Sequence, residues 1–155
     1  MIYLLDTDIL IHMMRGLKIR VARTEAQKLR VQQARNILSA CRTQSKAGHT
    51  VACSAITLAE LEFGARNSLD YEQEAAATRV AMSAFQAFDW TVEGCVEAYG
   101  FIRHHLESKG KSIGENDQLI AAHAMALKAV LVTNNTGEFT RIPGLKVENW
   151  TVSSA

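Results

Sequence analysis

Short apolar runs alternate with longer amphipathic stretches along this chain. Residues 2–5, 50–53 and 129–133 have the length and composition of buried strands, and a last short strand is expected at 146–148. A stretch with helical spacing of its apolar positions follows the first two runs. Strands that alternate with helices in this way predict an α/β domain with a small, mainly parallel sheet covered by helices.

The longest of the expected helices begins after Thr24, because Gln27 three residues later completes a capping box. Its apolar face is formed by Val31, Ala34, Ile37, Leu38 and Cys41. Basic side chains return to the opposite face at helical spacing, at Lys28, Arg35, Arg42 and Lys46. Such a charged face is typical of a solvated surface, and the alternative is the wall of a nucleic-acid groove.

Further helices are predicted along the rest of the chain. Ser54 caps one that is apolar nearly all round, as expected of a helix buried in the core. Two more span residues 70–88 and 91–108. The apolar stripe of the second is formed by Val92, Val96, Tyr99, Ile102 and Leu106. Asn116 is the expected N-cap of the last, which places Asp117 on a first helical turn, where the helix dipole favours a carboxylate.

Length and composition indicate one globular domain over residues 1–155, with 18–48 an extended basic helical segment within it. No apolar run approaches the roughly 20 residues of a membrane helix. The N-terminus has no basic region before Asp6, so a signal peptide is not expected. Three widely spaced cysteines favour buried thiols in a reducing cytoplasm over disulfides or a zinc site.

The net charge of +1 conceals an asymmetry between the two parts of the chain. Residues 1–49 carry nine Lys and Arg against three Asp and Glu, a balance of +6. Residues 50–155 carry eight against thirteen, a balance of −5. The basic first third indicates a polyanionic partner.

Candidate chemistry lies in three carboxylates. Asp6 follows the first strand, Asp117 begins a helix, and Glu60 stands in an apolar helix, where it needs a partner or a rim position that reaches water. Carboxylates held together repel, and Mg²⁺ with oxygen ligands relieves that repulsion. Asn135, at the end of a strand, could add a neutral oxygen ligand or orient a ligating water. Such a centre activates water and neutralises charge on a phosphate.

Four ordered blocks carry a resemblance to a known family: MIYLLDTDILI, ITLAELEFGA, IGENDQLIAAHA and LVTNNTGEFTRIPGL. Together they resemble the PIN-domain ribonucleases, and more closely the VapC toxins of bacterial toxin–antitoxin pairs. The resemblance implies a three-layer PIN-like fold and a Mg²⁺- or Mn²⁺-dependent endoribonuclease that stops translation by cutting RNA, often tRNA. It also implies inhibition by a small cognate antitoxin, and a toxin homodimer.

By position, the resemblance carries the family's acidic metal ligands over to Asp6, Glu60 and Asp117. The fourth acidic position falls on Asn135, so the number of metal ions stays open at one or two. The resemblance supplies no role for the long basic segment 18–48, which could serve the RNA path, antitoxin contact or a dimer surface.

Two alternatives belong to other functional classes. One is a PIN-like RNA-binding or scaffolding domain without catalysis, against which the retention of all three acids counts. The other is a haloacid-dehalogenase-type phosphatase, because Asp6-Thr7-Asp8 resembles its nucleophile motif. Leu10 stands where that motif has Thr or Val, and no paired acidic motif follows later. No histidine lies at triad spacing, so no general base is assigned, and a metal-bound water can take that part.

Overall fold

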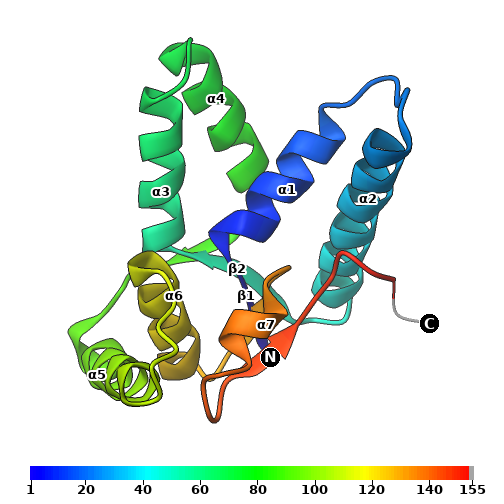
Figure 1. Cartoon of the computed structure of the whole chain (residues 1–155). Helices are drawn as coiled ribbons and strands as arrows, with labels where there is room; N and C mark the ends of the chain where they lie inside the picture. Colours follow the sequence, from blue (N-terminus) through cyan, green and yellow to red (C-terminus); the bar gives the residue numbers. More distant parts are fainter. Residues whose placement is uncertain (154–155) are drawn as a thin grey trace.

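The computed structural model describes residues 1–153 and confirms the α/β fold. Its sheet has five strands in the order β3-β2-β1-β4-β5, and all neighbouring pairs are parallel (Figure 1). The strands are β1 (Ile2–Leu5), β2 (Thr50–Ser54), β3 (Gln86–Phe88), β4 (Val130–Val132) and β5 (Lys146–Glu148). β1 is central, and the parallel pairing brings its carboxyl end beside the carboxyl ends of β2 and β4.

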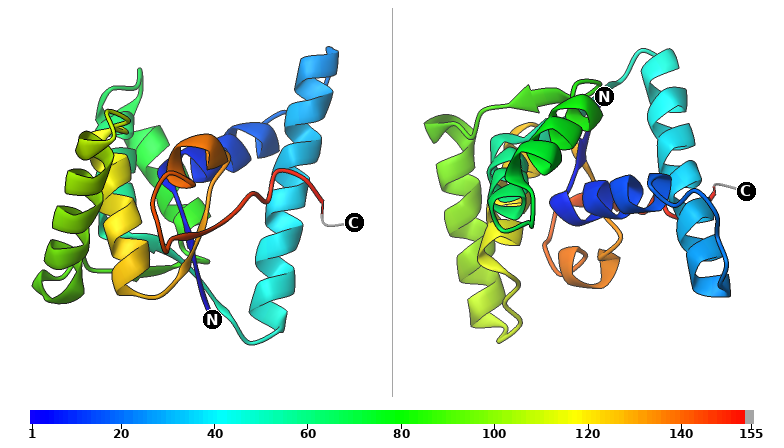
Figure 2. Two further views of the ribbon diagram at one scale, coloured as in Figure 1. Left: turned by 60° about the horizontal axis from the view of Figure 1, so that its bottom comes forward. Right: turned by 90° about the horizontal axis from the view of Figure 1, so that it is seen from above.

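Helices cover both faces of this sheet, as Figure 2 shows from two further directions. They are α1 (Thr7–Leu17), α2 (Glu25–Lys46), α3 (Ala55–Arg66), α4 (Tyr71–Met82), α5 (Val92–Ser108), α6 (Glu115–Ala126) and α7 (Thr136–Phe139). Side chains alternate between the faces along β1. Tyr3 and Leu5 join the core with α1 and α2, whereas Leu4 joins the core with α5 and α6. The result is the expected three-layer arrangement. Within residues 1–153, none of these helices combines the length and the apolar character that crossing a membrane requires.

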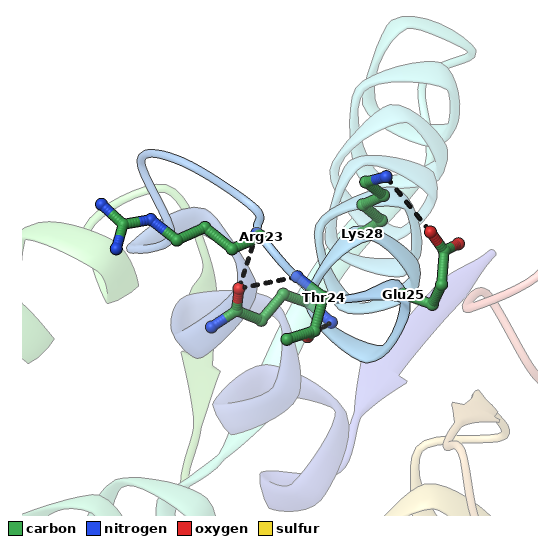
Figure 3. Close-up of polar contacts among 5 residues, drawn as sticks. Arg23, Thr24, Glu25 and Lys28 are labelled. Carbon is green, nitrogen blue, oxygen red and sulfur yellow. Dashed lines mark hydrogen bonds and ion pairs between the residues drawn. The ribbon is translucent and has the colours of Figure 1, made fainter.

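The start of α2 matches the predicted capping box (Figure 3). The Gln27 backbone N–H donates to the Thr24 hydroxyl at 3.1 Å, and the Gln27 side-chain oxygen accepts from the Thr24 N–H at 3.3 Å. The same oxygen accepts from the Arg23 N–H at 2.7 Å. Lys28 and Glu25 form an exposed ion pair on the first turn. These bonds satisfy the backbone donors that would otherwise be free where the helix begins.

α2 packs closely on α1 through a glycine. A Cβ atom added at Gly16 would lie 2.5 Å from the Ala34 Cβ atom and 2.8 Å from the Arg30 carbonyl oxygen. The predicted apolar face of α2 points to this contact, with Ala34, Ile37 and Cys41 buried. The two helices therefore approach at a distance that only glycine permits at position 16.

The prediction that α3 is buried in the core is wrong. Its buried side chains are limited to Thr57, Leu61 and Ala65, while Phe63 is 70% exposed. α3 packs against α4 on one side and leaves an apolar face uncovered. A helix that is apolar all round is expected either in a core or at a surface that binds another protein, and the pattern alone does not separate the two.

Two helix boundaries also differ from the predictions. α6 is capped by Gly114 and not by Asn116, although Asp117 still lies on its first turn. The helix expected over 70–88 ends at Met82, because its last residues form the edge strand β3.

In α5, the backbone departs from helical geometry at Glu93 and Gly94, and Gly94 has a φ of 84°. This turn leaves Val92 and Val96 exposed, so the predicted stripe fails at its start, while Ile102 and Leu106 are buried as predicted.

Candidate active site

Asp6 lies at the carboxyl end of β1, where the chain passes into α1. Its Oδ1 atom caps the helix by accepting from the Ile9 N–H at 2.8 Å, and its own N–H donates to the Val132 carbonyl at 3.0 Å. The side chain is buried, with 1% of its surface exposed. Its Oδ2 atom has no hydrogen-bond partner of normal geometry, although the Thr133 hydroxyl is near enough to lower the pKa of the carboxyl group.

Burial dominates the electrostatics of Asp6. It raises the pKa from 3.8 to about 7, against the opposing effects of the Thr133 hydroxyl and the Ile9 amide. The negative charges of Asp8 and Asp117 raise it further. A positive charge close to this carboxyl group would lower its pKa and favour the ionised form.

Asp117 occupies the first turn of α6 and faces the same region. Its Oδ2 atom lies close above Gly114, where an added Cβ atom would be only 3.1 Å away. Partial burial raises its pKa to about 6, and the charges of Asp8, Glu138 and Glu60 add to the rise in that order. Acidic groups from α1, α3 and α7 therefore all act on the start of α6.

Glu60 reaches the site from α3. Its side chain is half-buried, so it is neither enclosed in the core nor fully exposed at a rim. The Thr7 hydroxyl, on the first residue of α1, donates to Glu60 Oε1 at 2.6 Å. The same hydroxyl lies 3.0 Å from the buried hydroxyl of Thr57, one turn earlier on α3. The partner that Glu60 needs is thus a neutral hydroxyl, not an arginine.

Asn135 lies at the rim, beyond the carboxyl end of β4. Its N–H donates to the buried Thr133 hydroxyl at 2.9 Å, and its side chain makes no capping bond to α7, which begins at the next residue. Asn135 is half-buried and immediately precedes α7, the helix that carries Glu138. Its role as a ligand or support stays a prediction.

Sequence reasoning missed two acidic residues and one hydroxyl of the site. Asp8 and Glu138 both act on Asp117, and Thr7 holds Glu60. The signal for Asp8 was its position on the first turn of a helix, two residues after Asp6. The signal for Glu138 is weaker, because it lies in a four-residue helix, which is too short to show a helical spacing of apolar positions.

A hard divalent cation fits this set of groups. The orphaned Oδ2 atom of Asp6 is an unused oxygen ligand, and the ion pairs among the described residues involve none of the five acids. At the same time, no three Asp, Glu, His or Cys side chains within residues 1–153 lie close enough together to form a ready-made metal site. Mg²⁺ is commonly held by only one or two carboxylates, with water as the remaining ligands.

His123 belongs to the framework of the site. Its ring is 1% exposed, and its Nδ1 atom lies 2.7 Å from the Ser54 hydroxyl. Ser54 in turn caps α3 by accepting from the Ile56 N–H at 3.1 Å. The histidine therefore links the middle of α6 to the start of α3.

Comparison with known proteins places this arrangement in a family. The PIN domain profile matches residues 3–145. "Ribonuclease VapC2" of Rickettsia felis is 46% identical over 102 residues, which cover 66% of this chain and 75% of that protein. "tRNA(fMet)-specific endonuclease VapC" of Salmonella typhimurium is 41% identical over 97 residues, which cover 63% of this chain and 73% of that protein.

A solved structure agrees over almost the whole length. The crystal structure of VapBC2 from Rickettsia felis, bound to a DNA fragment from their promoter, matches with a TM-score of 0.80 and 36% identity. The match covers 97% of this chain and 99% of that chain. Both the sequence and the fold of this chain therefore match those of a solved structure. The chain belongs to the PIN-domain family, among its VapC ribonucleases.

Proposed function

We propose that this protein is a Mg²⁺-dependent endoribonuclease that acts as the toxin of a toxin–antitoxin pair. The observation that carries the proposal is the Asp6 carboxyl group, which is buried at the carboxyl end of the central strand with one oxygen unpartnered and Asp117 acting on it. A buried carboxyl oxygen without a hydrogen-bond partner does not by itself stabilise the folded state. Its position at the ligand-binding edge of a parallel sheet is that of a functional group.

In this proposal, Asp6 and Asp117 hold the cation, and Glu60 is a further ligand or orients a water. Mn²⁺ can replace Mg²⁺, because both accept carboxylate and water oxygens. The bound ion would supply an activated water and neutralise charge that develops on a phosphodiester. Glu60 stays in place through its bond from Thr7, and Asn135 supports the rim from the loop before α7.

The proposed substrate is RNA, and specifically tRNA. A relative whose name is tRNA(fMet)-specific endonuclease supports the tRNA class, since it is 41% identical over 97 residues. Four exposed basic side chains of α2, at Lys28, Arg35, Arg42 and Lys46, add a surface of the right sign for a polyanion. With the basic residues before Thr24, they form the positively charged part of the molecule.

Two protein partners belong to the proposal, a cognate antitoxin and a second copy of the chain. The crystallised relative is a VapBC complex, which supports the antitoxin. Large apolar side chains are exposed on α3, α4 and α5, among them Leu58, Phe63, Val80, Val92 and Phe101. Exposed apolar surface on this scale is typical of a face that another protein covers.

Cleavage of RNA by the purified chain tests this function. We expect Mg²⁺-dependent cleavage that is lost on chelation with EDTA and lost in Asp6→Asn and in Asp117→Asn. Both substitutions preserve side-chain shape but remove the charge. Cleavage that survives both changes would point to a contaminant or to another site.

The catalytically inactive RNA-binding domain remains the second candidate, favoured by the lack of a ready-made three-acid cluster within residues 1–153. It predicts RNA binding without cleavage under every metal condition. Comparing RNA-binding and cleavage assays on the same preparation separates the two functions. The match to the PIN family gives the phosphatase alternative no support.

A further inference from the structure

The Thr7 hydroxyl joins α1 to α3 within the acidic site. Thr7 is the first residue of α1, between Asp6 and Asp8, and it is 5% exposed. Its Oγ1 atom lies 2.6 Å from Glu60 Oε1 and 3.0 Å from Thr57 Oγ1. The Thr7 hydroxyl has a single proton, so it can donate a hydrogen bond in only one of these two contacts.

The proton of Thr7 goes to Glu60. An ionised carboxylate only accepts hydrogen bonds, and a hydroxyl has one proton to donate and two lone pairs. The shorter of the two contacts is the one to the carboxylate, as expected of a charge-assisted bond. Thr57 must then donate its own proton to Thr7, which fixes a chain of bonds that runs from Thr57 through Thr7 to Glu60.

This chain of bonds divides the two oxygens of Glu60 between different tasks. Oε1 accepts the hydrogen bond from the Thr7 hydroxyl of α1. Oε2 has no such bond to Thr7 and is the oxygen left for other ligands. Because Glu60 is only half-buried, its long side chain would otherwise sample several rotamers.

We propose that Thr7 is a positioning residue that holds Glu60 by one oxygen, so that Glu60 orients a water through Oε2 and does not chelate the cation with both oxygens. This inference rests on the proposed nuclease function and assigns Glu60 one of the two roles left open there. It follows that Thr7 acts on the rate of cleavage and leaves the affinity for the cation to Asp6 and Asp117.

Removing the hydroxyl while keeping the side-chain shape tests the proposal. Thr7→Val is expected to lower kcat for RNA cleavage by about 10- to 100-fold, the usual effect of losing an outer partner of a metal site. The dissociation constant for Mn²⁺, measured on the purified protein by calorimetry, is expected to stay unchanged. Thr7→Ser, which restores the hydroxyl, is expected to recover most of the rate.

Three further single variants and one double variant extend this test. Thr57→Val keeps the bond to Glu60 but removes its support, so its effect on kcat is expected to be smaller than that of Thr7→Val. Glu60→Ala removes the acceptor, and adding Thr7→Val to it is expected to have no further effect on kcat. Thr43→Val, at an exposed position of α2, is the matched control and is expected to behave as wild type.

The outcomes separate this inference from the proposed function. A wild-type protein that binds Mn²⁺ but cleaves no RNA overturns both. Active wild type with Thr7→Val at full rate overturns the positioning role alone. The same holds if Thr7→Val and Glu60→Ala both weaken Mn²⁺ binding, because Glu60 would then be a direct ligand. Independent effects of Thr7→Val and Glu60→Ala on kcat would also overturn it.

Discussion

Replacing Asp6 by Asn is expected to make the metal-free protein more stable. The pKa of Asp6 is raised from 3.8 to about 7, chiefly by burial. At pH values above both numbers, the folded protein keeps an ionised group that burial disfavours, and a shift of this size corresponds to about 4 kcal/mol. Asn cannot ionise, and its side-chain oxygen can still accept from the Ile9 N–H that caps α1. We therefore expect the free energy of unfolding to rise by up to about 4 kcal/mol, or roughly 10 °C in Tm.

The direction of the pH dependence follows from linkage. An acid with a raised pKa in the folded state contributes stability that is fully present below its unfolded value of 3.8 and lost as the pH rises through about 7. The gain from Asp6→Asn is therefore small at about pH 4 and reaches its full size at about pH 8. Addition of Mg²⁺ reduces the gap, because a bound cation stabilises the wild-type carboxylate and not the amide.

Urea unfolding of both proteins in EDTA, across this pH range, measures the effect. Asp70→Asn is the matched control, because Asp70 also caps a helix, by accepting from the Gln73 N–H at 3.2 Å, but is exposed. It is expected to leave stability nearly unchanged, since Asn and Asp are equivalent N-caps. If the Asp6→Asn protein were less stable than wild type at about pH 8, the ionised Asp6 carboxylate would stabilise the fold, contrary to this prediction.

The remaining predictions concern other parts of the molecule. Asp117→Ala should abolish RNA cleavage yet leave Tm in EDTA unchanged or higher, because its carboxyl group is repelled by its neighbours; a large drop in Tm would count against this. Replacing Arg35 and Arg42 together by Glu should weaken RNA binding and flatten its dependence on salt in a filter-binding assay. A change in antitoxin binding alone would instead assign that face to a protein interface. Gly16→Ala should destabilise the protein by about 1–3 kcal/mol in urea unfolding, because the added methyl group overlaps α2, whereas Gly100→Ala meets open space and should not. If the two glycine variants were equally stable, α1 and α2 would be able to move apart without a loss of unfolding free energy.

The sequence predicts the parts of the fold that rest on local chemistry. The apolar run of β1, the caps at Thr24 and Ser54 and the place of Asp6 all hold, because each depends on a few adjacent residues. Asp117 also lies on a first turn as expected, although Gly114 and not Asn116 begins the helix. A glycine cap gives little signal, since it offers no side chain that accepts a hydrogen bond.

The parts that fail depend on long-range packing. Whether an apolar helix such as α3 is covered by the same chain or left for a partner is decided by elements distant in sequence, and Phe63 proves to be uncovered. The bond from Thr7 to Glu60 joins residues 53 positions apart, and no local pattern contains it. The same is true of Glu138, whose charge acts on Asp117 from another part of the chain.

The proposed metal centre is tested most directly by an anomalous-scattering map of the protein crystallised with Mn²⁺. We expect one strong peak at the edge of the sheet, with Asp6 and Asp117 as its protein ligands and Glu60 contributing at most through water. A peak elsewhere, or none at saturating Mn²⁺, would contradict the claim that these buried acids form a metal centre.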